Sequence, residues 1–122
     1  MKTNAAVLLI LLFAPFVLAA QSGGDLELFR EAEDHYRTGN TLLALERFED
    51  FARRYPLSDR MPDAQYRIGV CQYRLGRYAE AVETFRRVES RYATTRYLDL
   101  TYFWAGMAHY HLGRWGDAVA AF

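Results

Sequence analysis

Apolar side chains return every three or four residues along most of the chain, and glycines interrupt the pattern. Gly39, Gly76 and Gly113 each close one apolar block, and the next block opens one or two residues later. This spacing is typical of amphipathic α-helices, and a glycine directly after an apolar block is typical of a helix C-terminus. With Asp25 as the first N-cap, the pattern predicts helices over 25–38, 41–55, 63–75 and 77–92, followed by a pair that begins near 99 and turns at Gly113.

The helical blocks are copies of one another at a step of 37 residues. A period between about 20 and 50 residues indicates a repeat architecture, in which neighbouring units bury each other's apolar faces. We therefore predict an all-α solenoid of antiparallel helix pairs over 25–61, 62–98 and 99–122, about two and two-thirds repeats, the last one incomplete. The alanines are predicted at close helix crossings, with the phenylalanines beside them. The repeated positions are Gly39, Ala44, Phe48, Gly69, Gly76, Ala81, Phe85, Gly106, Gly113, Ala118 and Phe122.

A helix that ends at glycine, followed by a helix that carries small-xxx-Phe, resembles the tetratricopeptide repeat. The resemblance covers about residues 25–122 and implies that the first helices of successive pairs line a concave groove where partner proteins bind. Its usual period is about 34 residues, so the longer step here places extra residues in the joint between units. The motif residues are Gly39, Ala44, Phe48 and Tyr55-Pro56 in the first unit, and Tyr66, Gly69, Gly76, Ala81 and Phe85 in the second.

The joint between the first two units carries a narrower resemblance. It reads YPLSDRMPDAQY over residues 55–66 and is closed by YRIG. This pattern is similar to the extracytoplasmic repeats of outer-membrane assembly lipoproteins and of Tol-Pal-associated periplasmic proteins, and it implies a role in the cell envelope. The second joint departs from it, because Ala93 and Thr95 stand where the first joint has Pro56 and Ser58.

Residues 1–20 have the composition of a secretory signal peptide. Lys2 precedes an apolar run that ends in small residues, so we expect cleavage after Ala19 or Ala20. An uncleaved signal anchor is the alternative. It is disfavoured because the run is shorter than the roughly 20 residues that span a bilayer and because Pro15 interrupts it. The sequence therefore predicts an exported, periplasmic protein.

The segment after the leader lacks a lipid-attachment cysteine. Gln21 occupies that place, so we expect no lipid anchor, and residues 21–24 read as a flexible lead. Without Lys2, fourteen basic residues remain against fifteen acidic ones, a balance that disfavours nucleic acid as a partner. The single cysteine, Cys71, cannot form an intrachain disulfide, and its place in an apolar stripe predicts a buried side chain.

Catalytic and metal-binding motifs are missing from the sequence. It contains no glycine-rich phosphate loop, no GxSxG, no HExxH, and no partner set for the lone cysteine. His109 and His111 are two residues apart, so on a helix they diverge by about 200°, whereas paired metal ligands on a helix are four residues apart. We therefore expect a non-enzymatic protein without a cofactor or a metal.

The first helix of each predicted pair carries a stripe, that is, three residues at i, i+4 and i+7 on one face. The last of the three is a tyrosine, and a basic residue or histidine follows it. Two interpretations are open: packing between helices, or an aromatic groove with a basic edge for an amphipathic or acidic peptide, since Tyr and Arg are enriched at interfaces. The groove hypothesis comprises Phe29, Tyr36, Arg37, Tyr66, Tyr73, Arg74, Phe103, Tyr110 and His111. The family's carboxylate-clamp groove uses Lys and Asn, and is not expected because its Asn-type positions are Glu33, Val70 and Met107.

Together these patterns predict a non-enzymatic protein-interaction scaffold in the cell envelope, with a protein or peptide as its partner. The alternatives are a subunit packed permanently in an envelope assembly machine and the repeat region of a longer envelope enzyme. Phe122 falls about two turns into the last predicted helix, without the polar capping helix that repeat arrays need. A fragment of a longer array is therefore predicted, with a covering partner as the alternative, and self-association through this uncapped helix is expected.

Overall fold

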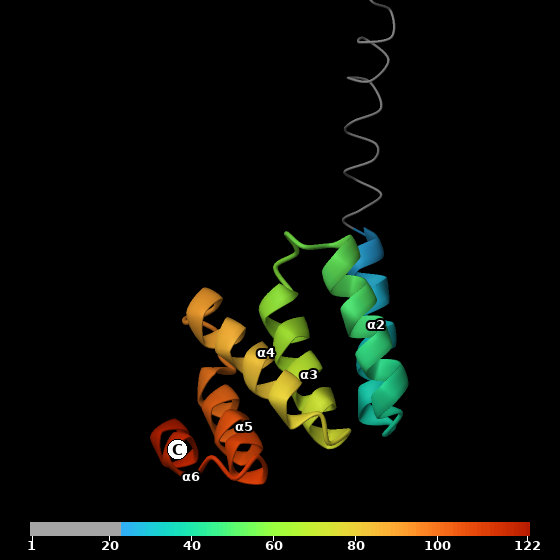
Figure 1. Ribbon diagram of the computed structural model, residues 1–122. Coiled ribbons are helices and arrows are strands. Elements are labelled where there is room, and N and C mark those ends of the chain that lie inside the picture. The colour runs from blue at the N-terminus through green and yellow to red at the C-terminus, as the bar shows by residue number, and fades with distance from the viewer. Residues whose placement is uncertain (1–22) are drawn as a thin grey trace, which may run out of the picture.

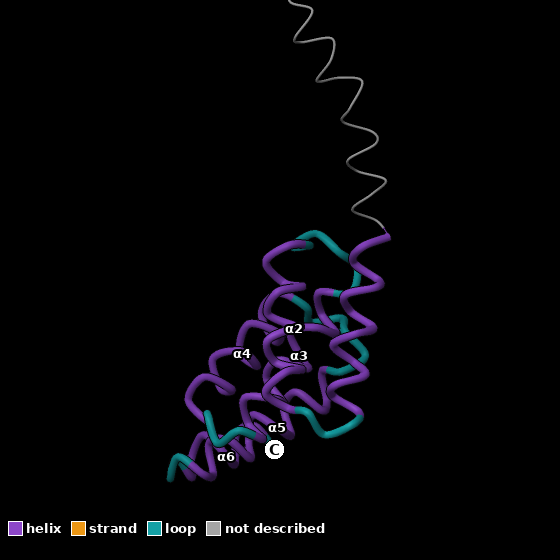
Figure 2. Tube along the Cα trace, turned by 90° about the vertical axis from the view of Figure 1, so that its right-hand side faces the viewer, coloured by secondary structure: helices purple, strands orange, loops and turns teal. Residues whose placement is uncertain are grey.

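The computed structural model describes residues 23–122 as six α-helices connected by short loops. The helix over 23–37 is followed by α2 (Thr41–Arg54), α3 (Met61–Arg74), α4 (Tyr78–Arg91), α5 (Leu98–His111) and α6 (Trp115–Ala121). The helices stack in a row, with α6 at the end opposite the first helix (Figure 1). Figure 2 shows only helices and loops in this part of the chain. The predicted all-α architecture of stacked helix pairs is confirmed.

Three glycines end the first helix of each pair in the same way. Gly39, Gly76 and Gly113 have φ angles of 84°, 75° and 72°, a left-handed conformation that glycine adopts without a Cβ clash. Each glycine N–H donates to the carbonyl three residues back, and the next N–H donates five residues back, as from Asn40 N to His35 O at 2.9 Å. This Schellman arrangement satisfies the last carbonyls of the helix. Its recurrence confirms the predicted stops and the 37-residue step.

The two joints between units share one local geometry although their sequences differ. Ser58 and Thr95 are 37 residues apart, and the hydroxyl oxygen of each accepts from the backbone N–H two residues later, at 3.2 and 3.4 Å. An aspartate on the first helix of each of these two pairs also binds a side chain of the joint. Asp25 accepts from the Ser58 hydroxyl at 2.6 Å, and Asp63 pairs with Arg96 at 3.4 Å. Thr95 therefore replaces Ser58 as the acceptor of this backbone N–H, whereas the carboxylate of the second joint binds Arg96 instead.

The core depends on small residues that face phenylalanine rings. The repeated alanines of the second helices are buried, as predicted, and Phe48 and Phe85 are fully buried. The tightest fit lies at Gly69, where an added Cβ would be 2.4 Å from a ring carbon of Phe85. An added Cβ at Gly106 would lie 2.8 Å from the ring of Phe122, although that ring is 66% exposed on its other side. The glycines, rather than the alanines alone, set these close approaches.

Two predicted boundaries are wrong. Gly23 and Gly24 are helical, so they do not belong to the flexible lead predicted over 21–24. Asp25 lies inside this helix rather than at its N-cap, because its carboxylate is bound to the joint. α3 begins at Met61, two residues earlier than predicted, because the Met61 side chain is buried in the core.

The predicted signal peptide over 1–20 lies outside the described residues. Its cleavage after Ala19 or Ala20 therefore stays a prediction. Within residues 23–122, every helix is too short or too polar to cross a bilayer.

α3 is the most enclosed helix of the stack. It packs against α2 and α4 and also contacts α5. Its Arg67 reaches the first helix, where it lies over the ring of Tyr36 and pairs with Glu33. Within the described residues, α2 and α4 make no comparable contact with each other, so α3 forms a floor between them.

Candidate functional site

Two of the predicted groove residues belong to the core. Phe29 and Tyr66 are only 6% and 5% exposed, so their assignment to an open groove is wrong. The ring of Phe29 packs edge-on against Phe48 and Phe51, with centroids 5.6 and 5.5 Å apart. Both of these phenylalanines belong to α2, the second helix of the same pair. For these residues the packing interpretation of the stripes is the one that the structure supports.

The stripe of the central unit packs against α5. Tyr66 stacks on Tyr97 with centroids 4.7 Å apart, and its hydroxyl accepts a hydrogen bond from Trp104 Nε1 at 3.1 Å. Tyr73 lies 5.0 Å from Trp104, and its hydroxyl is 3.1 Å from Nε2 of His111. This stripe is therefore the contact surface between successive units.

The equivalent stripe of α5 is accessible. Phe103 and Tyr110 are 47% and 49% exposed. The ring of Phe103 contacts Phe122 of the C-terminal residues at a centroid distance of 6.0 Å, while α6 covers a neighbouring face of α5. These two groove candidates thus lie on an open aromatic surface. Self-association through this end of the array stays a prediction.

Five of the nine candidates lie along one edge of the stack, which we call the basic aromatic edge: Tyr36, Tyr73, Arg74, Tyr110 and His111. The Arg74 guanidinium lies 4.5 Å from the ring centroid of Tyr36, a cation–π contact between the first and second units. The His111 ring lies 5.6 Å from Tyr73 and 5.8 Å from Tyr110. Arg74 and His111 are exposed. The edge therefore combines aromatic rings with accessible nitrogen donors.

Two further arginines modify the predicted edge. Arg37 forms an ion pair with Asp34 on its own helix, which offsets its charge locally. Arg67, which the sequence analysis did not select, lies 4.4 Å over the ring of Tyr36 and 3.7 Å from the Glu33 carboxylate. Arg67 and Arg74 are seven residues apart and share one face of α3. That i, i+7 spacing is the signal by which the sequence could have identified Arg67.

The buried titratable groups of α3 favour their neutral forms. Burial raises the pKa of the Cys71 thiol to about 11, and a thiol with a raised pKa is a poor nucleophile at neutral pH. Burial also raises the pKa of the Tyr66 hydroxyl. Among residues 23–122, no group of three His, Cys, Asp or Glu side chains is placed to hold a metal ion.

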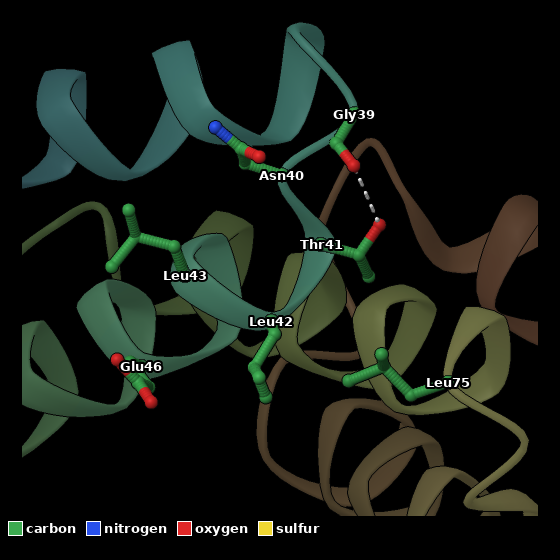
Figure 3. Close-up of a pocket in the computed structure, with 7 residues that line it drawn as sticks. All are labelled: Gly39, Asn40, Thr41, Leu42, Leu43, Glu46 and Leu75. Atoms are coloured by element: carbon green, nitrogen blue, oxygen red, sulfur yellow. Dashed lines mark hydrogen bonds between the residues drawn. The ribbon is translucent and has the colours of Figure 1, made fainter.

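A hollow of about 590 Å³ lies beside the turn between the first helix and α2 (Figure 3). Leu75 borders it from the end of α3, and the Thr41 hydroxyl donates to the Gly39 carbonyl at 3.5 Å. In the second unit Tyr78 stands in place of Thr41, and its ring stacks on His111 at 4.4 Å. The small Thr41 side chain thus contributes to this opening. Its lining is mainly aliphatic and backbone, from Gly39, Asn40, Thr41, Leu42, Leu43, Glu46 and Leu75.

Comparison with protein families identifies the tetratricopeptide repeat, whose sequence model matches residues 29–94. The match covers more than half of the chain, from within the first helix to just past the end of α4. No curated protein matches the sequence.

Proposed function

Since the chain belongs to the tetratricopeptide repeat family, we propose that it acts as a non-enzymatic interaction scaffold in the bacterial cell envelope. Tetratricopeptide repeats generally mediate protein–protein interactions and are typically non-catalytic. The partner is a protein or peptide that binds at the basic aromatic edge, on the side of the array formed by the first helices. The envelope location rests on the leader over 1–20 and on the sequence of the first joint.

The observation that carries this proposal is the continuity of the basic aromatic edge across three units. Tyr36 comes from the first unit, Tyr73 and Arg74 from the second, and Tyr110 and His111 from the third. Arg74 packs on the ring of Tyr36, and His111 packs on Tyr73 and Tyr110, so a partner that binds there orders few additional side chains. Tyr and Arg often supply most of the binding energy at protein interfaces, and guanidinium groups suit carboxylates.

Reversing one charge at the centre of the edge tests this function. Arg74→Glu replaces an exposed cation, so the melting temperature should change little, corresponding to less than about 1 kcal/mol. With the protein as bait in a periplasmic extract, we expect partner recovery to fall at least about tenfold, because a rim charge of the wrong sign repels a complementary surface. Quantitative mass spectrometry of the recovered proteins provides the measurement.

Arg86→Glu is the matched control. Arg86 is exposed on α4, pairs with Glu83 at 2.8 Å and lies outside the basic aromatic edge. The Arg86→Glu variant should recover the same partner as the wild type. Equal recovery by Arg74→Glu and the wild type would remove the edge from the proposal, and equal loss in both variants would indicate a general effect of net charge.

A further inference from the structure

A second hollow, of about 310 Å³, lies between α2 and α4, where α3 forms the floor. Gln72 of this floor and Arg74 of the basic aromatic edge are two residues apart on α3, so their side chains diverge by about 200°. The hollow and the edge are therefore on different sides of the array. Its lining consists of Glu49, Ala52 and Arg53 from α2, Gln65, Ile68 and Gln72 from α3, and Arg87 from α4.

Two glutamine amides stand in the floor of this hollow. Gln72 is only 7% exposed, and its Oε1 accepts from the Thr84 hydroxyl at 2.7 Å, which leaves its NH2 group to donate elsewhere. Gln65 Oε1 is buried and has no hydrogen-bond partner among the described residues. A buried acceptor without a partner is unfavourable, because no hydrogen bond compensates for its lost hydration. The floor thus offers an acceptor and a donor that a ligand can satisfy.

The repeat itself shows that helix packing does not require these amides. Gln65, Gln72 and Thr84 each replace other residue types in the neighbouring units. Their equivalents, 37 residues before and after, are Leu28 and Tyr102, His35 and His109, and Arg47 and Ala121. The two amides and the hydroxyl that orients one of them therefore occur together only in the central unit of the described array.

We propose that this hollow binds an extended, acidic peptide segment of a partner protein. Gln65 and Gln72 are two helical turns apart, about 10.5 Å along the axis. An extended chain covers that distance in about three residues at roughly 3.3 Å each. One amide can then accept from a peptide N–H while the other donates to a peptide carbonyl. Recognition of the backbone in this way fixes the segment without selecting one side-chain sequence.

Charges at the rim favour an acidic segment. Arg53 and Arg87 flank the floor from opposite walls. Arg53 also pairs with Asp50 at 3.2 Å and Glu49 lies in the lining, so Arg87 is the main attraction for a negative charge. Arg87 donates to the Thr84 hydroxyl at 3.3 Å, so the hydroxyl that orients Gln72 also positions this guanidinium. This site goes beyond the proposed function, because it lies on a different side of α3 from the basic aromatic edge and is flanked by the second helices α2 and α4.

The test is an NMR titration of the ¹⁵N-labelled protein with a capped peptide of alternating Glu and Thr, about eight residues long, enough to span the floor in extended form. The side-chain NH2 signals of Gln65 and Gln72 report directly on the site. We expect both to shift saturably with this peptide, and not with its Lys–Thr counterpart. Arg74→Glu should leave this binding unchanged.

Two variants taken from the repeat sharpen the test. Gln65→Leu and Gln72→His introduce residues that neighbouring units carry at these positions, so circular dichroism should show a retained fold. Each should weaken binding of the Glu–Thr peptide at least about tenfold.

The proposal is overturned if the glutamine signals stay unchanged, if the shifts centre on Phe103 and Tyr110, or if the Lys–Thr peptide binds equally. It is also overturned if both folded variants bind as well as the wild type. A negative result here, with Arg74→Glu still losing its periplasmic partner, would leave the proposed function intact.

Discussion

α3 and α5 carry the same aromatic stripe at equivalent positions, yet only α3 buries it. Tyr66 and Val70 of α3 are 5% and 0% exposed, whereas Phe103 and Tyr110 of α5 are 47% and 49% exposed. The residue types do not explain the difference, because both stripes are apolar and aromatic. α5 covers the stripe of α3, whereas α6 packs on another face of α5. Whether such a stripe is core or surface is therefore decided by the neighbouring unit.

The first helix carries polar residues where α3 carries apolar ones. α3 packs apolar side chains against α2, but the first helix has exposed acidic residues at the equivalent positions, Glu27, Glu31 and Asp34. Exposed acidic side chains stay hydrated. The exposed faces of the first and third units thus differ in kind, because one is acidic and the other is aromatic.

The largest expected effect is the loss of stability on truncating the buried stripe of α3, compared with the same truncation in the exposed stripe of α5. Tyr66→Ala removes a buried ring stacked on Tyr97 and leaves Trp104 Nε1 without its acceptor, so it should lower the free energy of unfolding by about 3–5 kcal/mol. Phe103→Ala should cost less than about 1 kcal/mol, because half of that ring is already in water. Urea denaturation followed by circular dichroism measures both. Equal losses in the two variants would mean that α5 is also covered in solution.

An intermediate effect is expected where a glycine faces a ring. Gly69→Ala places a methyl group 2.4 Å from a ring carbon of the fully buried Phe85, so overpacking should cost about 1–3 kcal/mol. Gly116→Ala in α6 is the control, since nothing lies within 4 Å of its added Cβ. It should stabilise by about 0.5–1 kcal/mol through helix propensity. Thermal melts in which Gly69→Ala also gained stability would show that the Phe85 ring moves aside.

The smallest effect is expected at Cys71, which corresponds to the fully buried Ala108 of α5. Cys71→Ala should therefore cost less than about 1 kcal/mol at neutral pH. The thiol has a reference pKa of 9.0, and burial raises it to about 11 in the folded protein. Between these values the unfolded chain loses a proton that the folded chain keeps, so the wild type loses stability as pH rises through this window.

Urea denaturation at a series of pH values measures that dependence. The difference in stability between the wild type and Cys71→Ala should stay constant below pH 9 and shift in favour of the variant as pH approaches about 11. Parallel pH curves for the two proteins would contradict a buried, protonated thiol.

The amino-acid sequence by itself determined the helices and their order. Gly39, Gly76 and Gly113 recur at the 37-residue step, and each adopts the left-handed conformation that ends a helix, because only a residue without a Cβ does so freely. Ser58 and Thr95 likewise form the same turn from local chemistry alone. These features depend on neighbours in the chain, so a local pattern is sufficient to predict them.

Only the tertiary structure decided which faces are buried and which are exposed. The i, i+4, i+7 spacing shows that Phe29, Tyr66 and Phe103 share one kind of stripe, but it does not show what lies opposite, and the first two are core while the third is surface. The pairing of Gln72 with Thr84 likewise joins two helices across a turn. Periodicity reports the face of one helix, whereas burial and hydrogen bonding depend on the helix that packs against it.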